Sequence, residues 1–217
     1  MLSAKNINKT YGDLNVLKDI DFSIEKGQIV SIVGASGAGK STLLHILGTL
    51  DRPDSGSLLL EETDLITLKN SELSKLRNKK IGFIFQFHNL LPEFTAFENI
   101  CLPGYIGKVN DDEVEKRGKA LMDLLGLKSR SHHKPSELSG GEQQRTAVAR
   151  ALINQPAIVF ADEPSGNLDS KNAEELHKLF LKLRADLGQT FVIVTHNQEL
   201  ANLADKKIEM LDGMLVK

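Results

Sequence analysis

The sequence predicts an α/β fold organised around a loop that binds phosphate. The apolar run 28–33 indicates a buried strand, the run 42–47 indicates a helix, and residues 34–41 between them read G-x-x-x-x-G-K-S. A strand, a glycine-rich loop and a helix in this order are what a phosphate-binding loop requires. The continuous apolar runs 157–161 and 191–194 are typical of central parallel strands that helices cover on both faces.

The loop predicts a site for a nucleoside triphosphate. Its glycines let backbone N–H groups point at phosphate oxygens, and the following helix directs its positive end at the same anion. We expect Lys40 to reach the β- and γ-phosphates and the Ser41 hydroxyl to hold Mg²⁺. The residues predicted to bind nucleotide here are Gly34, Ala35, Ser36, Gly37, Ala38, Gly39, Lys40, Ser41 and Thr42.

A length of 217 residues suits one domain over residues 1–217, and a composition of 41% hydrophobic and 26% charged residues is ordinary for a globular protein. A net charge of −2 argues against a general nucleic-acid binder. The single cysteine, Cys101, excludes an internal disulfide and fits a reducing compartment, and its apolar neighbours predict that it is buried. No apolar run approaches the ~18 residues of a membrane span, so we expect any membrane role to require a partner.

Residues 1–33 read as strands, since Ile20, Phe22 and Ile24 alternate with polar residues. Tyr11 lies in a turn, where it is either a surface residue or an aromatic platform for a base. The segments that follow are a loop at 51–57, a short strand at 58–60, a short helix at 71–77 and a strand at 81–85 that ends at Gln86.

Residues 87–152 read as helical, and we interpret them as an insertion into the α/β core. Within them, acids at 111–113 begin a helix whose apolar stripe ends near Gly126. After the insertion, apolar residues at helical spacing over 176–187 predict a helix, and 208–216 predict a hairpin on an Asp-Gly turn.

Asp162 and Glu163 follow the strand 157–161, and ligands in an open parallel sheet bind outside the carboxyl ends of the strands. The two acids should therefore meet the phosphate loop. Asp162 suits Mg²⁺ binding beside Ser41, and Glu163 could polarise a water for attack on the γ-phosphate. The alternative is that both are merely solvated acids at a strand end.

Gln86 and His196 each stand at the end of an apolar strand. Judged alone, either is most simply a surface residue. Judged with the phosphate loop, Gln86 can ligate Mg²⁺ and position water, and His196 can contact the γ-phosphate.

Residues 139–142, Ser-Gly-Gly-Glu, have the spacing of a capping box, and the simplest interpretation is a helix start. Yet Gly140 and Gly141 remove side chains from the positive end of that helix, so an anion could approach its backbone. One chain would then hold two different phosphate sites, an arrangement that favours two protomers sharing nucleotides.

Residues 138–145, Leu-Ser-Gly-Gly-Glu-Gln-Gln-Arg, resemble the signature motif of ATP-binding cassette (ABC) ATPases, and the other cassette motifs are present in order. The resemblance covers essentially the whole chain. It implies a RecA-like core, an antiparallel β region at the start, a helical subdomain at about 87–152 and a head-to-tail homodimer around two ATPs. Each ATP would contact one protomer's phosphate loop and the other's Ser139, Gly140, Gly141 and Glu142.

The same resemblance implies a role for each remaining motif residue. Tyr11 corresponds to the aromatic residue that stacks on adenine, and Asp169 to the aspartate that contacts the facing protomer. Gln86, Glu163 and His196 correspond to the Q-loop glutamine, the catalytic base and the switch histidine. Hydrolysis of ATP with Mg²⁺ is the resulting expectation.

A narrower resemblance, carried by residues 83–100 and 161–169, is to the lipoprotein-releasing ATPases, whose branch includes macrolide-exporter and cell-division ATPases. The familiar form has Thr where Ser165 stands. This implies an ATPase at the cytoplasmic face of the cell membrane that drives membrane permease subunits docked near residues 87–100. Cell-division and exporter ATPases remain open as alternatives. A soluble cassette acting on nucleic acid is disfavoured by the single cassette, the absence of heptads and the acidic balance.

Overall fold

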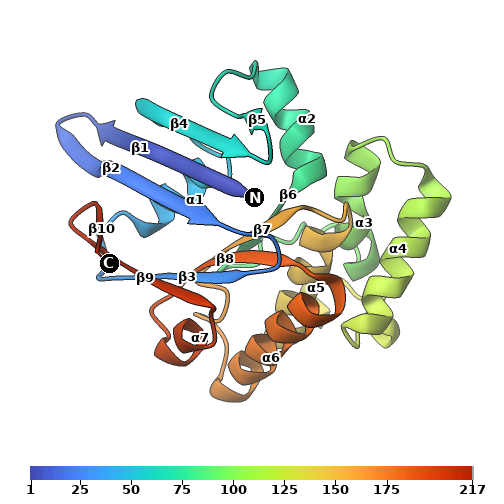
Figure 1. The fold of residues 1–217 in the computed structure, drawn as a ribbon. Coiled ribbons are helices and arrows are strands. Elements are labelled where there is room, and N and C mark those ends of the chain that lie inside the picture. Colours follow the sequence, from blue (N-terminus) through green and yellow to red (C-terminus); the bar gives the residue numbers. More distant parts are fainter. Residues whose placement is uncertain (217) are drawn as a thin grey trace.

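Two stacked β-sheets form the framework of the computed structural model, which describes residues 1–216 (Figure 1). The smaller sheet is antiparallel, in the order β2-β1-β4-β5. The larger sheet has the order β10-β9-β3-β8-β7-β6. The strands are β1 (Leu2–Tyr11), β2 (Leu14–Ile24), β3 (Ile29–Val33), β4 (Ser55–Leu60), β5 (Thr63–Asp64), β6 (Ile81–Phe85), β7 (Ile158–Asp162), β8 (Thr190–Val194), β9 (Lys206–Leu211) and β10 (Met214–Val216). The expected antiparallel β region and α/β core are both confirmed.

Strands β9, β3, β8, β7 and β6 run parallel, so their carboxyl ends lie at one edge of the sheet. The register places Phe85 beside Asp162, and Asp162 beside Val194. The residues that follow these strands therefore begin at the same edge of the sheet. They are Gln86, Glu163 and Thr195. This alignment explains why motifs far apart in sequence converge.

Helices cover both faces of the larger sheet (Figure 1). The α-helices of the described chain are α1 (Lys40–Leu47), α2 (Asn70–Lys80), α3 (Ala96–Ile106), α4 (Asp111–Leu124), α5 (Gly140–Leu152), α6 (Ser170–Leu187) and α7 (Gln198–Asn202), of which α4 packs on α3 and α5 rather than on the sheet. Helix α1 lies in the core between the two sheets. On the opposite face, α5 and α6 pack on the sheet, and the rings of Phe180 and Phe191 lie 5.0 Å apart. Burying one such ring contributes roughly 2–3 kcal/mol to stability.

The first helix after β6 begins later than the expected position 87. Helix α3 starts at Ala96, where Thr95 and Glu98 form a capping box. Residues 87–95 instead form turns, because His88 and Asn89 have φ of +62° and +49°, which a right-handed helix does not accept. Cys101 on α3 is fully buried, as expected, and burial raises the pKa of its thiol to about 11.

The C-terminal hairpin is confirmed, with β9 and β10 paired antiparallel across Asp212 and Gly213. Helix α6 begins at Ser170, before the apolar repeat predicted over 176–187, because Asp169 forms its N-cap. The short helix α7, which Asn197 caps, was not predicted. Within residues 1–216, no helix has both the length and the apolar character that crossing a membrane requires.

Candidate functional site

The phosphate loop joins β3 to α1 and is pressed closely against β2 and β9. Gly34 has φ +153°, and a Cβ there would lie 2.2 Å from the carbonyl oxygen of Met210. Gly39 is the N-cap of α1 with φ +102°, and a Cβ there would lie 2.9 Å from the carbonyl oxygen of Val16. Only glycine fits these positions, and the loop is thereby held at the N-terminus of α1, where anions bind.

Lys40, the first residue of α1, keeps its ammonium group beside the loop. Its Nζ donates hydrogen bonds to the carbonyl oxygens of Gly34, at 3.0 Å, and Ala35, at 2.8 Å. Residues 35–37 are exposed, whereas Ala38 is buried. The loop thus presents to solvent both its exposed backbone and, beside it, the ammonium group of Lys40.

Ser41 and Asp162, the predicted Mg²⁺ ligands, lie together. The Ser41 hydroxyl donates to Oδ1 of Asp162 at 3.1 Å. Burial raises the pKa of Asp162, and the bond from Ser41 opposes that rise. Oxygen donors of this kind suit Mg²⁺, which at phosphate sites takes one or two protein oxygens and completes its shell with phosphates and water.

No cluster of three or more His, Cys, Asp or Glu side chains in residues 1–216 is arranged to hold a metal ion. A cation at the Ser41–Asp162 pair would therefore draw its remaining ligands from the nucleotide and from water.

Glu163 and His196 also lie together, at the ends of β7 and β8. Oε2 of Glu163 is 2.8 Å from Nδ1 of His196 and accepts the backbone N–H of His196 at 3.1 Å. Glu163 has φ +45°, and its own N–H donates to the carbonyl oxygen of Val194 at 2.9 Å. A left-handed residue costs of order 1 kcal/mol, so the turn is held by these bonds to β8. The imidazole is 71% exposed and the carboxylate 18% exposed.

Gln86 bonds to Asn167 rather than to the predicted metal ligands. Its Nε2 donates to Oδ1 of Asn167, and Nδ2 of Asn167 donates back to the carbonyl oxygen of Gln86, both at 3.1 Å. Among the described residues, no hydrogen bond joins Gln86 to Ser41 or Asp162. Sequence reasoning assigned no role to Asn167, and only its place in the segment after Glu163 pointed to it.

Tyr11 lies at the end of β1 and is 49% exposed. Its hydroxyl donates to Oδ2 of Asp51 at 2.5 Å, and this bond raises the pKa of Tyr11 to about 12. The side chain of Thr42 opposes that rise, which places the phenol near the start of α1. The Lys9 ammonium sits 5.0 Å from the ring centroid. An exposed ring, fixed in orientation, thus stands close to the phosphate loop.

Ser139 and Glu142 form the predicted capping box at the start of α5. The Ser139 side chain accepts the backbone N–H of Glu142, and Glu142 accepts both the N–H and the hydroxyl of Ser139. Arg130 donates to the same carboxylate at 2.7 Å. The bonds from Ser139, and after them Arg130, lower the pKa of Glu142 to about 2. The carboxylate therefore fixes the shape of the helix N-terminus.

The N-termini of α5 and α6 are neighbours. A Cβ at Gly141 would lie 2.2 Å from Oδ1 of Asn172, which in turn bonds to Asp169, the N-cap of α6. Gly140 faces Leu168. In the described part of the chain, no hydrogen bond or ion pair joins residues 139–142 to residues 34–42. One chain therefore carries the two predicted phosphate sites apart from each other.

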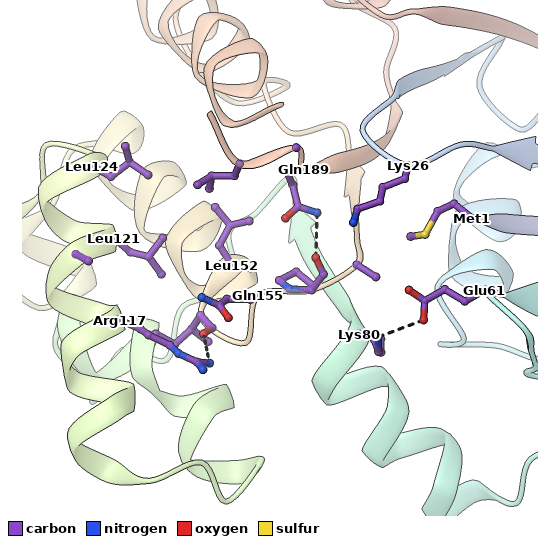
Figure 2. A pocket seen from close by; sticks show the side chains of 16 residues that line it. Met1, Lys26, Glu61, Lys80, Arg117, Leu121, Leu124, Leu152, Gln155 and Gln189 are labelled. Atoms are coloured by element: carbon purple, nitrogen blue, oxygen red, sulfur yellow. Dashed lines mark hydrogen bonds and ion pairs between the residues drawn. The ribbon is translucent and has the colours of Figure 1, made fainter. Parts of the chain in front are cut away.

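A cavity of about 540 Å³ lies away from these residues, at the amino ends of the parallel strands (Figure 2). Arg117, Leu121 and Leu124 of α4 form one side, and Met1 and Lys26 stand on the other. None of the predicted site residues lines it. The predicted site residues thus lie at the carboxyl edge of the sheet and not in this cavity.

Comparison with known proteins agrees with this arrangement. Residues 17–166 match the family described as ABC transporter. The chain is 62% identical to the lipoprotein-releasing system ATP-binding protein LolD of Cytophaga hutchinsonii, over 100% of this chain and 99% of that protein. It is 57% identical to the LolD of Bacteroides fragilis, over 100% of both chains.

Two solved structures of the ATP-binding cassette MJ0796 are similar over 100% of this chain and 97% of theirs. One is a dimeric structure, with a TM-score of 0.91 and 41% identity. The other is a dimeric post-hydrolysis state bound to ADP and Pi, with a TM-score of 0.91 and 40% identity.

Proposed function

Because the chain belongs to the ABC transporter family, and is an ATP-binding ATPase of that family, we propose that it powers a membrane complex that releases lipoproteins. The observation that carries this proposal is full-length identity of 62% and 57% to two proteins named for lipoprotein release. The site supports the ATPase part independently, since a phosphate loop, an acid–hydroxyl pair and an acid–histidine pair meet at one sheet edge.

ATP would bind with its phosphates on the loop 34–42 and its adenine on Tyr11. Backbone N–H groups at the N-terminus of α1 favour the negative charge, and Lys40 exchanges its carbonyl partners for phosphate oxygens. Ser41 and Asp162, with Gln86 at the neighbouring strand end, would hold Mg²⁺, which neutralises charge on the phosphates.

Hydrolysis would depend on Glu163, His196 and Gln86. The carboxylate of Glu163 is positioned to accept a proton from a water molecule, and its bonds to His196 fix its direction. His196 exposes most of its ring, so it can contact a γ-phosphate that arrives from solvent. Gln86, oriented by Asn167, would place the water.

The second half of each site would come from a partner protomer in a head-to-tail dimer. The N-terminus of α5, capped by Ser139, would offer the backbone N–H groups of Gly140 and Gly141 to the γ-phosphate, and Asp169 beside it would contact the facing chain. The similar cassette MJ0796 forms dimers.

The membrane subunits would dock on the helical subdomain, for which we propose the bounds 87–152, near residues 87–100. Phe87 is 74% exposed in this segment, and Leu91 and Phe94 are also exposed. Such apolar side chains suit contact with an amphipathic helix. This docking would hold the chain on the cytoplasmic face of the cell membrane.

The substitution Glu163→Gln tests the ATPase mechanism. Glutamine keeps the shape but cannot accept the proton, so ATP turnover should fall at least ~100-fold while ATP still binds. The variant should form a stable dimer with ATP and Mg²⁺ in size-exclusion chromatography with light scattering. Adding Lys40→Ala to it should restore the monomer. A monomer of Glu163→Gln at saturating ATP would contradict the shared-site proposal.

Affinity purification from native membranes tests the partner. We expect to recover a membrane protein with a large periplasmic domain that belongs to a lipoprotein-releasing complex. Recovery of a cell-division or exporter subunit would replace the lipoprotein part of the proposal and leave the ATPase chemistry intact.

A further inference from the structure

A buried polar pair lies beside the residues assigned to hydrolysis. Ser165 belongs to the turn between β7 and α6 and is 8% exposed, and His177 of α6 is 3% exposed. Nε2 of His177 lies 3.4 Å from the hydroxyl oxygen of Ser165. Among residues 1–216, neither side chain makes a hydrogen bond to any other protein group. Each is therefore the other's partner.

Breaking this pair would be costly. A hydroxyl or an imidazole that is removed from water destabilises the fold unless it forms a hydrogen bond. Burial lowers the pKa of His177, and the carboxylates of Glu199 and Glu174 oppose that fall. The ring is therefore neutral near pH 7, with one nitrogen that donates and one that accepts, so it can bond to a hydroxyl in either direction. Loss of either side chain would leave the other buried without its partner.

The turn that contains Ser165 spans residues 163–169 and is closed by two backbone hydrogen bonds. The N–H of Gly166 donates to the carbonyl oxygen of Glu163 at 3.0 Å, and the N–H of Leu168 donates to that of Ser165 at 3.2 Å. Ser165 is buried, whereas Gly166 is exposed. The side chain of Ser165 therefore joins this turn to α6.

Helix α6 holds the turn at two separated points. Asp169 is the N-cap of the helix and accepts the N–H of Asn172 at 2.8 Å. His177 lies roughly 12 Å farther along the helix axis than Asp169, at ~1.5 Å per residue. A turn that is attached to one rigid helix at two such points cannot pivot about the N-cap alone.

Residues assigned to hydrolysis lie at both ends of this turn. Glu163 begins it and bonds to His196. Asn167, near the other end, bonds to Gln86. Because a misplacement of about 1 Å can lower an enzyme's rate by as much as ~100-fold, the orientation of the turn matters for turnover.

We propose that His177 is a positioning residue for ATP hydrolysis, which acts by holding Ser165 and thereby the turn 163–169 in the orientation that turnover requires. This rests on the proposed function, because that proposal assigns Glu163 as the base and Gln86 as the residue that places the water. It adds a buried pair, one member of which is on α6, to the residues on which kcat depends.

Steady-state ATPase kinetics of the full chain test this role. His177→Leu and Ser165→Ala should each lower kcat about 10-fold and leave KM within twofold, because the phosphate loop is unchanged. His177→Gln should keep kcat within about threefold of the wild type, because its amide can still donate to the hydroxyl or accept from it. A wild-type kcat in either His177→Leu or Ser165→Ala would overturn the inference.

Leu183→Ala is the matched control for lost stability. Leu183 is fully buried on the same helix and lies farther from the turn than His177 does. Its replacement should lower Tm at least as much as His177→Leu does, because it opens a cavity in the core, and should leave kcat at 25 °C unchanged. If Leu183→Ala lowers kcat as much as His177→Leu, the effect comes from helix stability and the inference fails.

A double-mutant cycle tests whether the two side chains act as one unit. Ser165→Ala combined with His177→Leu should have a kcat within twofold of the slower single variant, because each single change already breaks the same bond. Losses that multiply would show two separate effects and would contradict the inference.

The same assays separate this inference from the proposed function. If Glu163→Gln hydrolyses ATP at the wild-type rate, the proposed site itself fails. If Glu163→Gln is inactive while His177→Leu and Ser165→Ala are fully active, only the inference fails.

Discussion

Glu142 offers a quantitative test of how the N-terminus of α5 is held. Its carboxylate accepts the N–H and the hydroxyl of Ser139 and the Nε–H of Arg130. Its pKa falls from an ordinary 4.5 to about 2. Each pKa unit corresponds to about 1.36 kcal/mol, so the carboxylate contributes at most about 3 kcal/mol.

The expected contribution is smaller, because Arg130 is 40% exposed and water screens its charge. We therefore expect Glu142→Ala to lower the free energy of unfolding by about 1–2 kcal/mol, which is also the usual cost of a lost N-cap. Glu142→Gln keeps an oxygen that can accept from Ser139 and loses only the charge, so we expect it to cost less than about 1 kcal/mol.

The sign of the pH dependence follows from the lowered pKa. A carboxylate with a lowered pKa stabilises the fold fully above its unfolded pKa of about 4.5 and loses that contribution as pH falls toward about 2. Urea unfolding of the wild type and of Glu142→Gln should therefore give curves that converge between pH 5 and the lowest pH at which the chain folds. Parallel curves over that range, or a Glu142 pKa above about 4 by NMR titration, would refute this reasoning.

Three further substitutions test the phosphate loop and its neighbours. Lys40→Ala should lose most affinity for a fluorescent ATP analogue, whereas Lys26→Ala, far from the loop, should not; near-normal binding by the first variant would contradict the loop assignment. Asn167→Ala removes both bonds to Gln86, so kcat should fall about 10-fold with KM within twofold, and an unchanged kcat would show that Gln86 needs no such support. Gly34→Ala should cost at least ~2 kcal/mol in urea unfolding, because its Cβ would lie 2.2 Å from a backbone oxygen. Gly37→Ala, in the same loop with no atom within 4 Å, is its control and should cost about 1 kcal/mol.

The convergence of the site residues could be predicted from sequence because it depends only on parallel strands. Once the runs before Gly34, Gln86, Glu163 and His196 are read as strands of one parallel sheet, their ends must share an edge. The register confirms this, with Phe85, Asp162 and Val194 side by side. Hydrophobic periodicity and turn residues are therefore enough to predict this convergence, without any knowledge of side-chain contacts.

The partners of individual side chains could not be predicted in the same way. The Asn167–Gln86 pair and the Arg150 bonds to residues 88 and 89 join segments more than 60 residues apart. No local period encodes such contacts. The turn at 87–95 was missed for a related reason, since its left-handed residues are His and Asn rather than the glycines that usually mark this conformation.

The separation of the two phosphate sites within one chain is itself an argument for a shared site. The phosphate loop lies at the end of β3, where the N-terminus of α1 is suited to bind one anion. The second free helix N-terminus, at α5, is fixed by its cap and packs beside α6 through Gly141 and Asn172. Bringing it to the loop of the same chain would break those contacts. A second copy placed head to tail presents the same helix end to the loop without that cost, and symmetry then completes two sites at once. In the proposed dimer, ATP binding and dimer closure would be one event, which is what a mechanical ATPase needs in order to transmit force to a membrane partner.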